Sequence, residues 1–395
     1  MKKKCLICNS FFLDFLDLGH HPCADTFLND KLKSQNLKKT RLKVGFCKCS
    51  HLTTVYPVNS HERYEKYDYS YTSSNSPISR YHFKNIANII SKNYLIKKNS
   101  FVVEAGSNDG TFLREIKRFY KCNVLGIDPS KNMCEIAKKK GIESISTYFN
   151  SQTSKTIIKK YGHADILYGA NVFNHVDDNL SFLDAANIIL KPGGMLVLEV
   201  PDLDSLIKKV GFDTIYHEHR HYYSIKSISK ILKLKNFYIK KFYKINYMAG
   251  SLRVFAFKSN KKIKQIKYKS IVDLKDFKIF KKKVSIITTE INKFVDQSIV
   301  QGTKIYGVGA ATKGNTLLNC CHLNSNKIEA ILDNSKYKIG KYTPGSAIKI
   351  INEKKIKKIE KGIILPWNIT TYLVNKLFKN KKNSYISIAR IVKKI

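Results

Sequence analysis

The stretch SFVVEAGSNDGTFLREIKRF, residues 100–119, decides the fold that the sequence predicts. A short apolar run ends in an acid, Glu104, two glycines follow at Gly106 and Gly110, and an amphipathic pattern comes next. This order predicts a strand, a tight turn and a helix. Glycines let the backbone approach a ligand closely, and the amino end of the helix faces that ligand. The stretch therefore predicts a nucleotide-type binding turn in an α/β domain.

The segments after this turn add further pieces of such a domain. NVLGIDPS predicts a strand that ends in Asp128, about 20 residues beyond the glycines, where a carboxylate can hydrogen-bond a ribose diol. ADILYGANVFNHVDD predicts a strand followed by a polar loop with His175, and LKPGGMLVLEVPD predicts a helix end, a turn and a buried strand. A dinucleotide turn normally reads G-x-G-x-x-G, whereas this one reads AGSNDG. The order of motifs resembles the class I methyltransferase core and favours S-adenosylmethionine over a nicotinamide cofactor.

Length and composition limit the classes of protein to consider. The 395 residues are enough for two or three domains, and a hydrophobic fraction of 43% suits soluble domains with cores. The chain shows no apolar run of about 18 residues and no signal-peptide pattern, so we expect no transmembrane helix, no membrane partner and a cytoplasmic location. The net charge of +41 comes mainly from Lys spread along the chain, which indicates compositional bias rather than a nucleic-acid surface. It should still attract anionic ligands such as nucleotides.

Two cysteine pairs near the amino terminus predict a metal site. The four residues are Cys5, Cys8, Cys47 and Cys49. Four thiolates from two turns can form the tetrahedron that structural zinc prefers, and such spacings in a cytosolic chain indicate metal rather than disulfides. Because the second pair is C-x-C, which is tighter than usual, Cys23 or His51 could supply the fourth ligand. Buried or free thiols are the alternative.

The carboxyl-terminal part repeats the pattern of strand, glycine turn and helix. KIYGVGAATKGNTLLN places Gly307 and Gly309 between an apolar strand and a helix, and IEAILDNS predicts a strand that ends in Asp333. Lys313 beside this turn favours a phosphate nearby, whereas a duplicated fold without a ligand is the alternative. A Lys-rich stretch over residues 260–301 predicts a linking helix.

FDTIYHEHRHYYS, residues 212–224, concentrates histidines, tyrosines and acids in one place. A surface loop with chance clustering is one alternative. Another is a metal site made by His217, His219 and His221, whose alternate positions would share one face of an extended strand. We favour a proton-handling site, because the cysteines already account for a metal.

Taken together, these motifs resemble the S-adenosylmethionine-dependent C-methyltransferases that act on nucleotide-linked keto-deoxysugars in branched-sugar pathways. The resemblance covers nearly the whole chain and rests on the cysteine pairs, HPCADTFL, YSYTSSNS, VEAGSNDG, NVFNH, FDTIYHEH, GSLRVF and YGVGAATKGNTLLN…PWN. It implies a small zinc-binding domain over 1–65, a class I methyltransferase Rossmann-like core over 66–258, and a linker helix with a second Rossmann-like α/β domain over 259–395. The sugar nucleotide would lie in the cleft between them, and we expect a monomer.

The resemblance also implies a mechanism and roles for the central motif. Such enzymes form a carbanion next to a ketone and methylate it, which requires a positioned base and donors around the enolate oxygen. By motif matching, His219 is the base, and Glu218 orients it or shuttles the proton. Tyr216 and His175 donate to the enolate oxygen or position the sugar. Tyr71 closes over the sugar.

Binding residues follow from the same motif matching. The residues implied around S-adenosylmethionine are Glu104, Gly106, Asn108, Asp109, Gly110, Asp128 and Asn171. The residues implied at the substrate are Lys313, Asn315 and Arg253, the first two at its nucleotide end. His217 and His221 are interpreted as structural or rim residues. The product would serve surface polysaccharide or secondary-metabolite assembly.

The chain departs from the family pattern at three places. Residues 248–251 read Met-Ala-Gly-Ser instead of His-Gly-Gly-Ser, the second cysteine pair is C-x-C, and Arg220 and His221 follow HEH in place of a small residue and an aromatic. These changes leave the methyl-transfer core intact. They leave the identity of the substrate open, which could be another keto-sugar or carry another nucleotide. The alternatives are O- or N-methylation or isomerisation of a nucleotide sugar. From another class, a zinc-containing RNA methyltransferase or nucleic-acid-binding protein fits the zinc site and charge, but no cluster of arginines and aromatics supports it.

Overall fold

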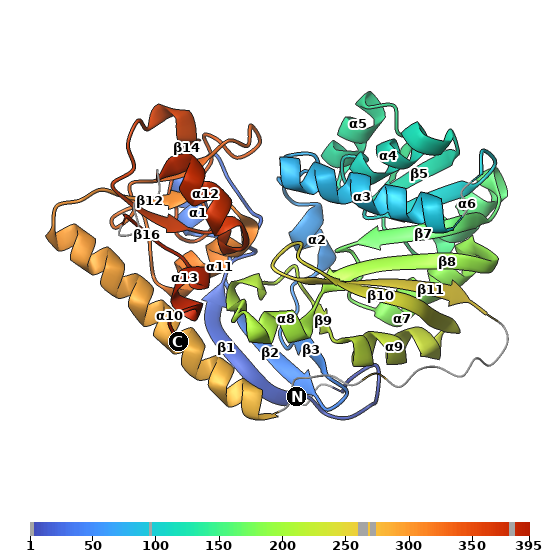
Figure 1. Ribbon diagram of the computed structural model, residues 1–395, viewed down its shortest axis with the longest axis horizontal. Coiled ribbons are helices and arrows are strands. Elements are labelled where there is room, and N and C mark those ends of the chain that lie inside the picture. Colours follow the sequence, from blue (N-terminus) through green and yellow to red (C-terminus); the bar gives the residue numbers. More distant parts are fainter. Residues whose placement is uncertain (1–3, 95–96, 260–267, 269–273, 379–383) are drawn as a thin grey trace.

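The computed structural model describes residues 4–94, 97–259, 268, 274–378 and 384–395. These residues form three β-sheets with flanking helices (Figure 1). The seven-stranded sheet lies in one lobe, the five-stranded sheet lies in the other, and the amino-terminal strands lie between and below them. Within this described part of the chain, no helix is both long and apolar enough to cross a membrane.

The largest sheet has the strand order β10-β11-β8-β7-β4-β5-β6. Its strands are β4 (Phe101–Ala105), β5 (Asn123–Asp128), β6 (Ser144–Ser146), β7 (Ala164–Ala170), β8 (Leu190–Pro201), β10 (Phe237–Ile245) and β11 (Ser251–Lys258). Neighbouring strands from β8 through β6 run parallel, whereas β11 pairs antiparallel with both β8 and β10. This arrangement, a parallel sheet with an antiparallel hairpin at one edge, confirms the predicted class I methyltransferase core.

Helices cover both faces of this sheet. They are α3 (Pro77–Asn93), α4 (Thr111–Tyr120), α5 (Lys131–Lys139), α6 (Ser151–Tyr161), α7 (Asn179–Ile189) and α9 (Ile225–Leu234). Val102 packs with α3 and α4, whereas its neighbour Val103 packs with α6, α7 and α9 on the opposite face. Successive residues of a strand point to opposite faces, so β4 must be apolar at both positions. This explains the continuous apolar run before Glu104.

The amino-terminal sheet takes one strand from the middle of the chain. Its order is β1-β2-β3-β9, made by β1 (Leu13–His21), β2 (Thr40–Cys47), β3 (His51–Thr54) and β9 (His221–Tyr223). Two short helices, α1 (Lys31–Gln35) and α2 (Ser60–Tyr64), belong to the same part of the chain. Since β9 belongs to the range predicted as core, the first two predicted domains share this sheet, and their boundary at residues 65 and 66 stays a prediction.

The carboxyl-terminal sheet is wholly parallel, in the order β14-β13-β12-β15-β16. Its strands are β12 (Ile305–Val308), β13 (Ala330–Asp333), β14 (Ile350–Asn352), β15 (Lys361–Ile364) and β16 (Tyr385–Ile386). The helices nearby are α10 (Leu274–Val300), α11 (Thr312–Cys320), α12 (Thr370–Leu377) and α13 (Ile388–Val392). This confirms a second Rossmann-like α/β unit. The expected placement of Gly307 in the turn is wrong, because Gly307 lies inside β12, where an added Cβ would meet Ile331 at 2.3 Å.

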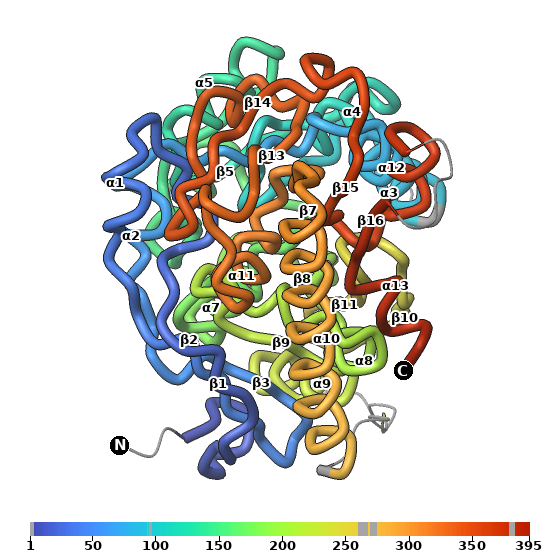
Figure 2. The backbone as a smooth tube through the Cα atoms, turned by 90° about the vertical axis from the view of Figure 1, so that its left-hand side faces the viewer, coloured from blue at the N-terminus to red at the C-terminus, as the bar shows by residue number. Residues whose placement is uncertain are grey.

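Helix α10 joins the carboxyl-terminal part to the amino-terminal sheet. Figure 2 shows it running down the face turned to the viewer. Its Phe277 ring lies 4.7 Å from Phe15 of β1 and 4.2 Å from Phe46 of β2, centroid to centroid. The predicted Lys-rich helix is therefore present over 274–300, while residues 260–267 and 269–273 of that prediction lie outside the described residues. The shared aromatic contacts fix the two outer parts of the chain against each other.

Candidate active site beside the amino-terminal sheet

Tyr216 and His219 form a direct pair just after the short helix η1 (Phe212–Thr214). The Tyr216 hydroxyl lies 2.7 Å from His219 Nε2, and His219 Nδ1 lies 2.9 Å from the carbonyl oxygen of Thr214. Since a carbonyl oxygen can only accept, Nδ1 carries the proton and Nε2 is the acceptor. Burial lowers the pKa of His219 to about 3. The ring is therefore neutral near pH 7, with its basic nitrogen toward the Tyr216 hydroxyl.

His175 lies next to this pair, in the loop that follows β7. Its ring centroid is 4.8 Å from that of His219, with the rings edge to face at 83°. The Tyr64 hydroxyl lies 2.5 Å from His175 Nδ1. Burial, followed by the nearby His219 and Arg63, lowers the pKa of His175 well below its usual value. Two neutral histidines from separate segments therefore lie together, and their proton-handling role stays a prediction.

Glu218, the residue before His219 in the sequence, is buried. Its Oε1 accepts from the backbone N–H of Asp25 at 2.8 Å, while Oε2 is buried without a hydrogen-bond partner among the described residues. Burial, with the Asp25 carboxylate close by, raises the pKa of Glu218 to about 7. A carboxyl that titrates near neutral pH can both take and return a proton. This fits the predicted shuttle role, which stays a prediction.

Asp25 connects three motifs that are far apart in the sequence. Its carboxylate accepts from the Ser70 hydroxyl at 3.0 Å, from the Ser70 N–H at 3.2 Å and from the Thr312 hydroxyl at 2.6 Å. HPCADTFL, YSYTSSNS and the carboxyl-terminal glycine motif thus meet next to Glu218. The neighbouring Tyr71 points its hydroxyl to within 3.4 Å of the Tyr247 hydroxyl, beside the segment that departs from the family pattern.

The glycine turn after β4 lies at the carboxyl end of that strand, next to the carboxyl ends of β5 and β7 in the large sheet. Gly106 has φ +68°, and an added Cβ would lie 2.9 Å from Val172. The carboxylate of Asp128 accepts from the backbone N–H groups of Asn108 and Ser130, at 2.8 and 2.9 Å. Glu104 is buried, and its Oε2 has no partner among the described residues. Ligands of such sheets bind outside the carboxyl ends of the strands, so this edge could hold a cofactor.

Two residues predicted at the cofactor instead contact the YSYTSSNS segment. Asn108 accepts from Ser73 N–H at 2.9 Å and donates to the Tyr71 carbonyl oxygen at 3.0 Å. The Asp109 carboxylate contacts the Ser74 hydroxyl, Thr111 and Lys140. Although burial opposes it, these donors hold the pKa of Asp109 below its usual value. The structure thus gives these residues an anchoring contact. Their contact with a cofactor stays a prediction, as it does for Gly110 and Asn171, which both have positive φ.

The three predicted substrate residues are not brought together at the histidines. Arg253 is buried on β11, where its Nε lies 2.7 Å from Glu199. Lys313 Nζ lies 2.6 Å from Asn368 Oδ1 and 4.2 Å from the centroid of the Trp367 ring, and burial lowers its pKa to about 8. Asn315 donates to the Ala24 carbonyl oxygen at 2.7 Å. Each side chain already has a partner in the protein, so its role with substrate stays a prediction.

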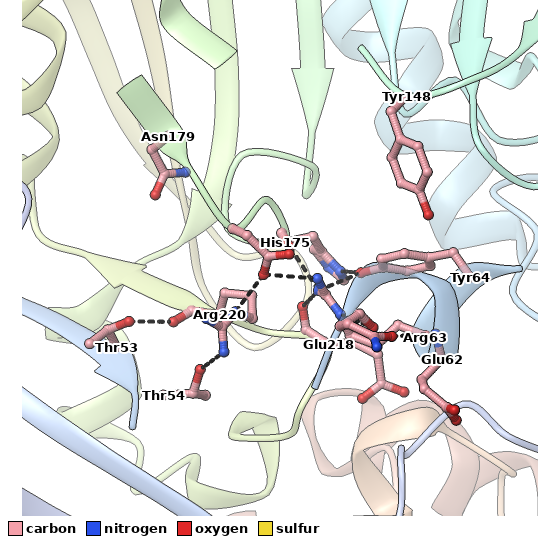
Figure 3. Close-up of polar contacts among 12 residues, drawn as sticks. Thr53, Thr54, Glu62, Arg63, Tyr64, Tyr148, His175, Asn179, Glu218 and Arg220 are labelled. Atoms are coloured by element: carbon pink, nitrogen blue, oxygen red, sulfur yellow. Dashed lines mark hydrogen bonds and ion pairs between the residues drawn. The ribbon is translucent and has the colours of Figure 1, made fainter. Parts of the chain in front are cut away.

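A cluster of polar residues that the sequence did not predict lies around His175 (Figure 3). Its members are Arg63, Tyr64, Asp177 and Arg220. Arg63 donates to the His175 carbonyl oxygen at 2.8 Å and to Asp177 Oδ1 at 3.0 Å, and Arg220 donates to the same oxygen at 2.9 Å. Both guanidinium groups are buried. The only local signal was the rarity of arginine in a Lys-rich chain.

The four predicted cysteines form a compact cluster. Their Sγ atoms all lie within 4.8 Å of one another, with 3.1 Å between Cys8 and Cys47 and 3.6 Å between Cys5 and Cys49. Among the described residues this is the one group of three or more ligands, and it includes neither Cys23 nor His51. The alternative metal site at His217, His219 and His221 is therefore wrong, since Nε2 of His217 lies 3.1 Å from the carbonyl oxygen of Thr40 and His219 binds Tyr216.

Comparisons with known proteins agree with this arrangement. A family model described as a methyltransferase domain matches residues 78–241, and one described as the C-methyltransferase C-terminal domain matches residues 248–387. The C-methyltransferase NovU of Streptomyces niveus is 27% identical over 359 residues, which cover 88% of this chain and 85% of that protein.

Solved structures give weaker likenesses. Magnesium protoporphyrin IX methyltransferase ChlM of Synechocystis, with bound S-adenosylmethionine, has a TM-score of 0.35 and 14% identity, covering 46% of this chain and 79% of that one. The cyclopropane synthase MmaA2 of Mycobacterium tuberculosis has a TM-score of 0.36 and 12% identity, covering 44% and 83%. Likenesses at these TM-scores carry no conclusion about this chain. These family models and the relative indicate that the chain is a methyltransferase, made of a methyltransferase domain followed by a C-methyltransferase C-terminal domain.

Proposed function

We propose that this enzyme methylates a nucleotide-linked 4-keto-deoxysugar at the carbon next to the ketone, with His219 as the base. The observation that carries the proposal is the state of His219. Its Nδ1 is held by the Thr214 carbonyl oxygen, so its neutral Nε2 is an acceptor, and it lies beside the Tyr216 hydroxyl and the His175 ring. Enolisation of a ketone requires a group that accepts a proton and groups that donate hydrogen bonds to the oxygen. Here His219 can accept the proton, and Tyr216 and His175 can donate.

The edge of the large sheet fits S-adenosylmethionine. The positive φ of Gly106 and the carboxylate of Asp128 at the end of β5 suit a nucleoside, and the unpartnered Oε2 of Glu104 suits a cationic or hydrogen-bond-donating group. A buried carboxylate oxygen without a donor is costly, and a bound ligand would relieve this cost. When bound there, S-adenosylmethionine supplies an electrophilic methyl group.

The residues of the chain then divide the proton work between them. A substrate ketone oxygen can accept the Tyr216 hydroxyl in place of His219, which frees Nε2 to take the proton from the neighbouring carbon. The positive charge that forms on His219 is stabilised by the Thr214 carbonyl oxygen, already 2.9 Å from Nδ1. Glu218, whose carboxyl titrates near neutral pH, passes the proton on toward solvent.

We also propose that the four cysteines bind a structural zinc ion. In a tetrahedral site with bonds of about 2.3 Å, the sulfurs lie about 3.8 Å apart, close to the separations seen here. All four ligand positions would be filled by protein, which is typical of a structural and not a catalytic site. Metal analysis of the purified protein should find about one zinc per chain, and a Cys8→Ser variant should lose it. Normal metal content in that variant would contradict the assignment.

The first experiment separates carbon methylation from other reactions. The enzyme is incubated in deuterated water with a panel of nucleotide-linked 4-keto-6-deoxysugars, with and without S-adenosylmethionine, and the sugar is followed by NMR and mass. We expect deuterium next to the ketone, and a methyl group there only when the cofactor is present. A methyl group on oxygen or nitrogen, or isomerisation without methylation, would overturn the proposal in favour of those reactions.

A further inference from the structure

Tyr64, at the end of α2, makes a short contact with His175 that the proposed chemistry has not used. The phenol oxygen lies 2.5 Å from His175 Nδ1, although the residues are 111 positions apart. Figure 3 shows the Tyr64 ring extending from α2 toward the imidazole. A contact of this kind fixes which of the two imidazole nitrogens carries the proton. If the hydroxyl donates to Nδ1, the proton of the neutral ring lies on Nε2, and if the hydroxyl accepts from Nδ1, the proton lies on Nδ1.

Arg63 favours one direction of this hydrogen bond. Its Nη1 lies 3.4 Å from the Tyr64 oxygen, and a guanidinium can only donate. With one lone pair of the Tyr64 oxygen facing Arg63, the hydroxyl proton is left for His175 Nδ1, the other polar atom in contact with this oxygen. Nδ1 of His175 is then the acceptor, and the neutral ring carries its proton on Nε2. This is the reverse of His219, where Nδ1 carries the proton.

Arg63 is itself held in place from several directions. It donates to the carbonyl oxygens of Asn59 and His175, at 3.3 and 2.8 Å, and its Nη2 lies 3.0 Å from Asp177 Oδ1. Its side chain is 1% exposed. A planar guanidinium with these partners cannot turn away from Tyr64 without breaking buried hydrogen bonds. Helix α2 and the loop that bears His175 are thus locked together.

We propose that Tyr64, oriented by Arg63, is a positioning residue that keeps the His175 proton on Nε2. On the proposed function, on which this inference rests, His175 then donates a hydrogen bond to the ketone oxygen while His219 accepts the carbon-bound proton. The two adjacent imidazoles have opposite roles because their Nδ1 atoms meet opposite partners: a hydroxyl donor at His175 and a carbonyl acceptor at His219.

The direct test is the tautomer of His175, read by NMR on protein labelled with ¹⁵N in histidine and assigned with a His175→Gln variant. We expect an unprotonated Nδ1 and a protonated Nε2, and we expect Tyr64→Phe to shift the signals toward the other tautomer or a mixture. Tyr148→Phe is the matched control, since Tyr148 donates to Glu65 and not to His175. A protonated Nδ1 in the unchanged protein, or no shift in Tyr64→Phe, would overturn the inference.

Kinetics give a second readout that a merely structural role would not produce. With an active keto-sugar, Tyr64→Phe should lower kcat about 10- to 100-fold and leave KM within about threefold, the scale of a misoriented catalytic group. Arg63→Lys, which keeps the charge but loses the fork, should shift the tautomer in the same direction. Equal kcat in Tyr64→Phe and Tyr148→Phe would contradict the positioning role. Because the NMR readout needs no substrate, failure of every sugar would count against the proposed function alone.

Discussion

The Thr312 hydroxyl donates to Asp25 at 2.6 Å and so bridges 287 positions of the chain. Asp25 is buried, and the donor comes from the first turn of α11, next to the carboxyl-terminal glycine motif. A hydrogen bond to a charged group contributes about 1.5–3 kcal/mol. Thr312→Val, which keeps the shape, should therefore lower the free energy of unfolding by about that amount in urea titrations. Thr312→Ser keeps the hydroxyl and should stay close to the unchanged protein; equal losses in the two variants would rule out this bond as the cause.

His219→Asn should remove nearly all turnover while S-adenosylmethionine binding stays within a few-fold. In the proposed mechanism the base acts on the sugar and not on the cofactor, so calorimetry should show nearly unchanged cofactor binding while methyl-transfer assays show the loss of turnover. His163→Asn, an exposed histidine, is the control and should keep full activity. Undiminished turnover in His219→Asn would remove His219 from the role of base.

Asp128→Ala should weaken S-adenosylmethionine binding by about 1.5–3 kcal/mol, the scale of a lost hydrogen bond to a charged group. The carboxylate also accepts from the backbone N–H of Asn108, so part of the loss will come from a looser glycine turn. Asp128→Asn, which keeps an acceptor oxygen, should lose less. Unaltered cofactor affinity in Asp128→Ala would show that the acid at the end of β5 does not face the cofactor.

The stability of the protein should fall with rising pH because of Glu218. Its carboxyl has an ordinary pKa of 4.5 and a pKa of about 7 in the fold, so the folded state holds the proton more tightly. This contribution is fully present below about pH 4.5 and is lost as pH rises through about 7, by up to about 3 kcal/mol. Urea unfolding at several pH values should show that the free energy of unfolding depends less on pH in Glu218→Gln. The exposed Glu360→Gln should keep the pH dependence, and an unaltered pH dependence in Glu218→Gln would contradict the shift.

Ala249→Gly should stabilise the protein by about 1 kcal/mol. Ala249 has φ +73°, a left-handed conformation that costs an L-residue about 1–2 kcal/mol, partly offset by the greater freedom of glycine in the unfolded chain. Ala256→Gly, at a buried position on β11, should instead destabilise it. Thermal unfolding of both variants tests this, and a lower Tm in Ala249→Gly would show that the methyl packing outweighs the strain.

The motifs with local patterns could be predicted from the sequence. Glu104, Gly106 and Asp128 mark strand ends and a turn, and parallel strands bring such ends to one edge without further information. The four cysteines were found because their spacing is local to two turns.

Contacts between distant segments left no such pattern. Arg63 and Tyr64 sit on a helix of five residues, and their contacts with His175 and Asp177 span more than 100 positions. Gly307 was placed in a turn because the pattern shows a glycine but not the Ile331 side chain that requires one inside β12. What decides these positions is the approach of segments in space, which one sequence does not record.

The strand β9 gives the amino-terminal sheet a second role beside that of holding the four cysteines. His221 to Tyr223 pair with His51 to Thr53 of β3, directly after the hairpin that carries Cys47 and Cys49. The FDTIYHEHRHYYS motif thus supplies a strand to the amino-terminal sheet, and it does not belong to the large sheet that carries the glycine turn. A chimaera that exchanges the methyltransferase core of two such enzymes would inherit the methyl donor site from one parent and a mismatched support for its base from the other.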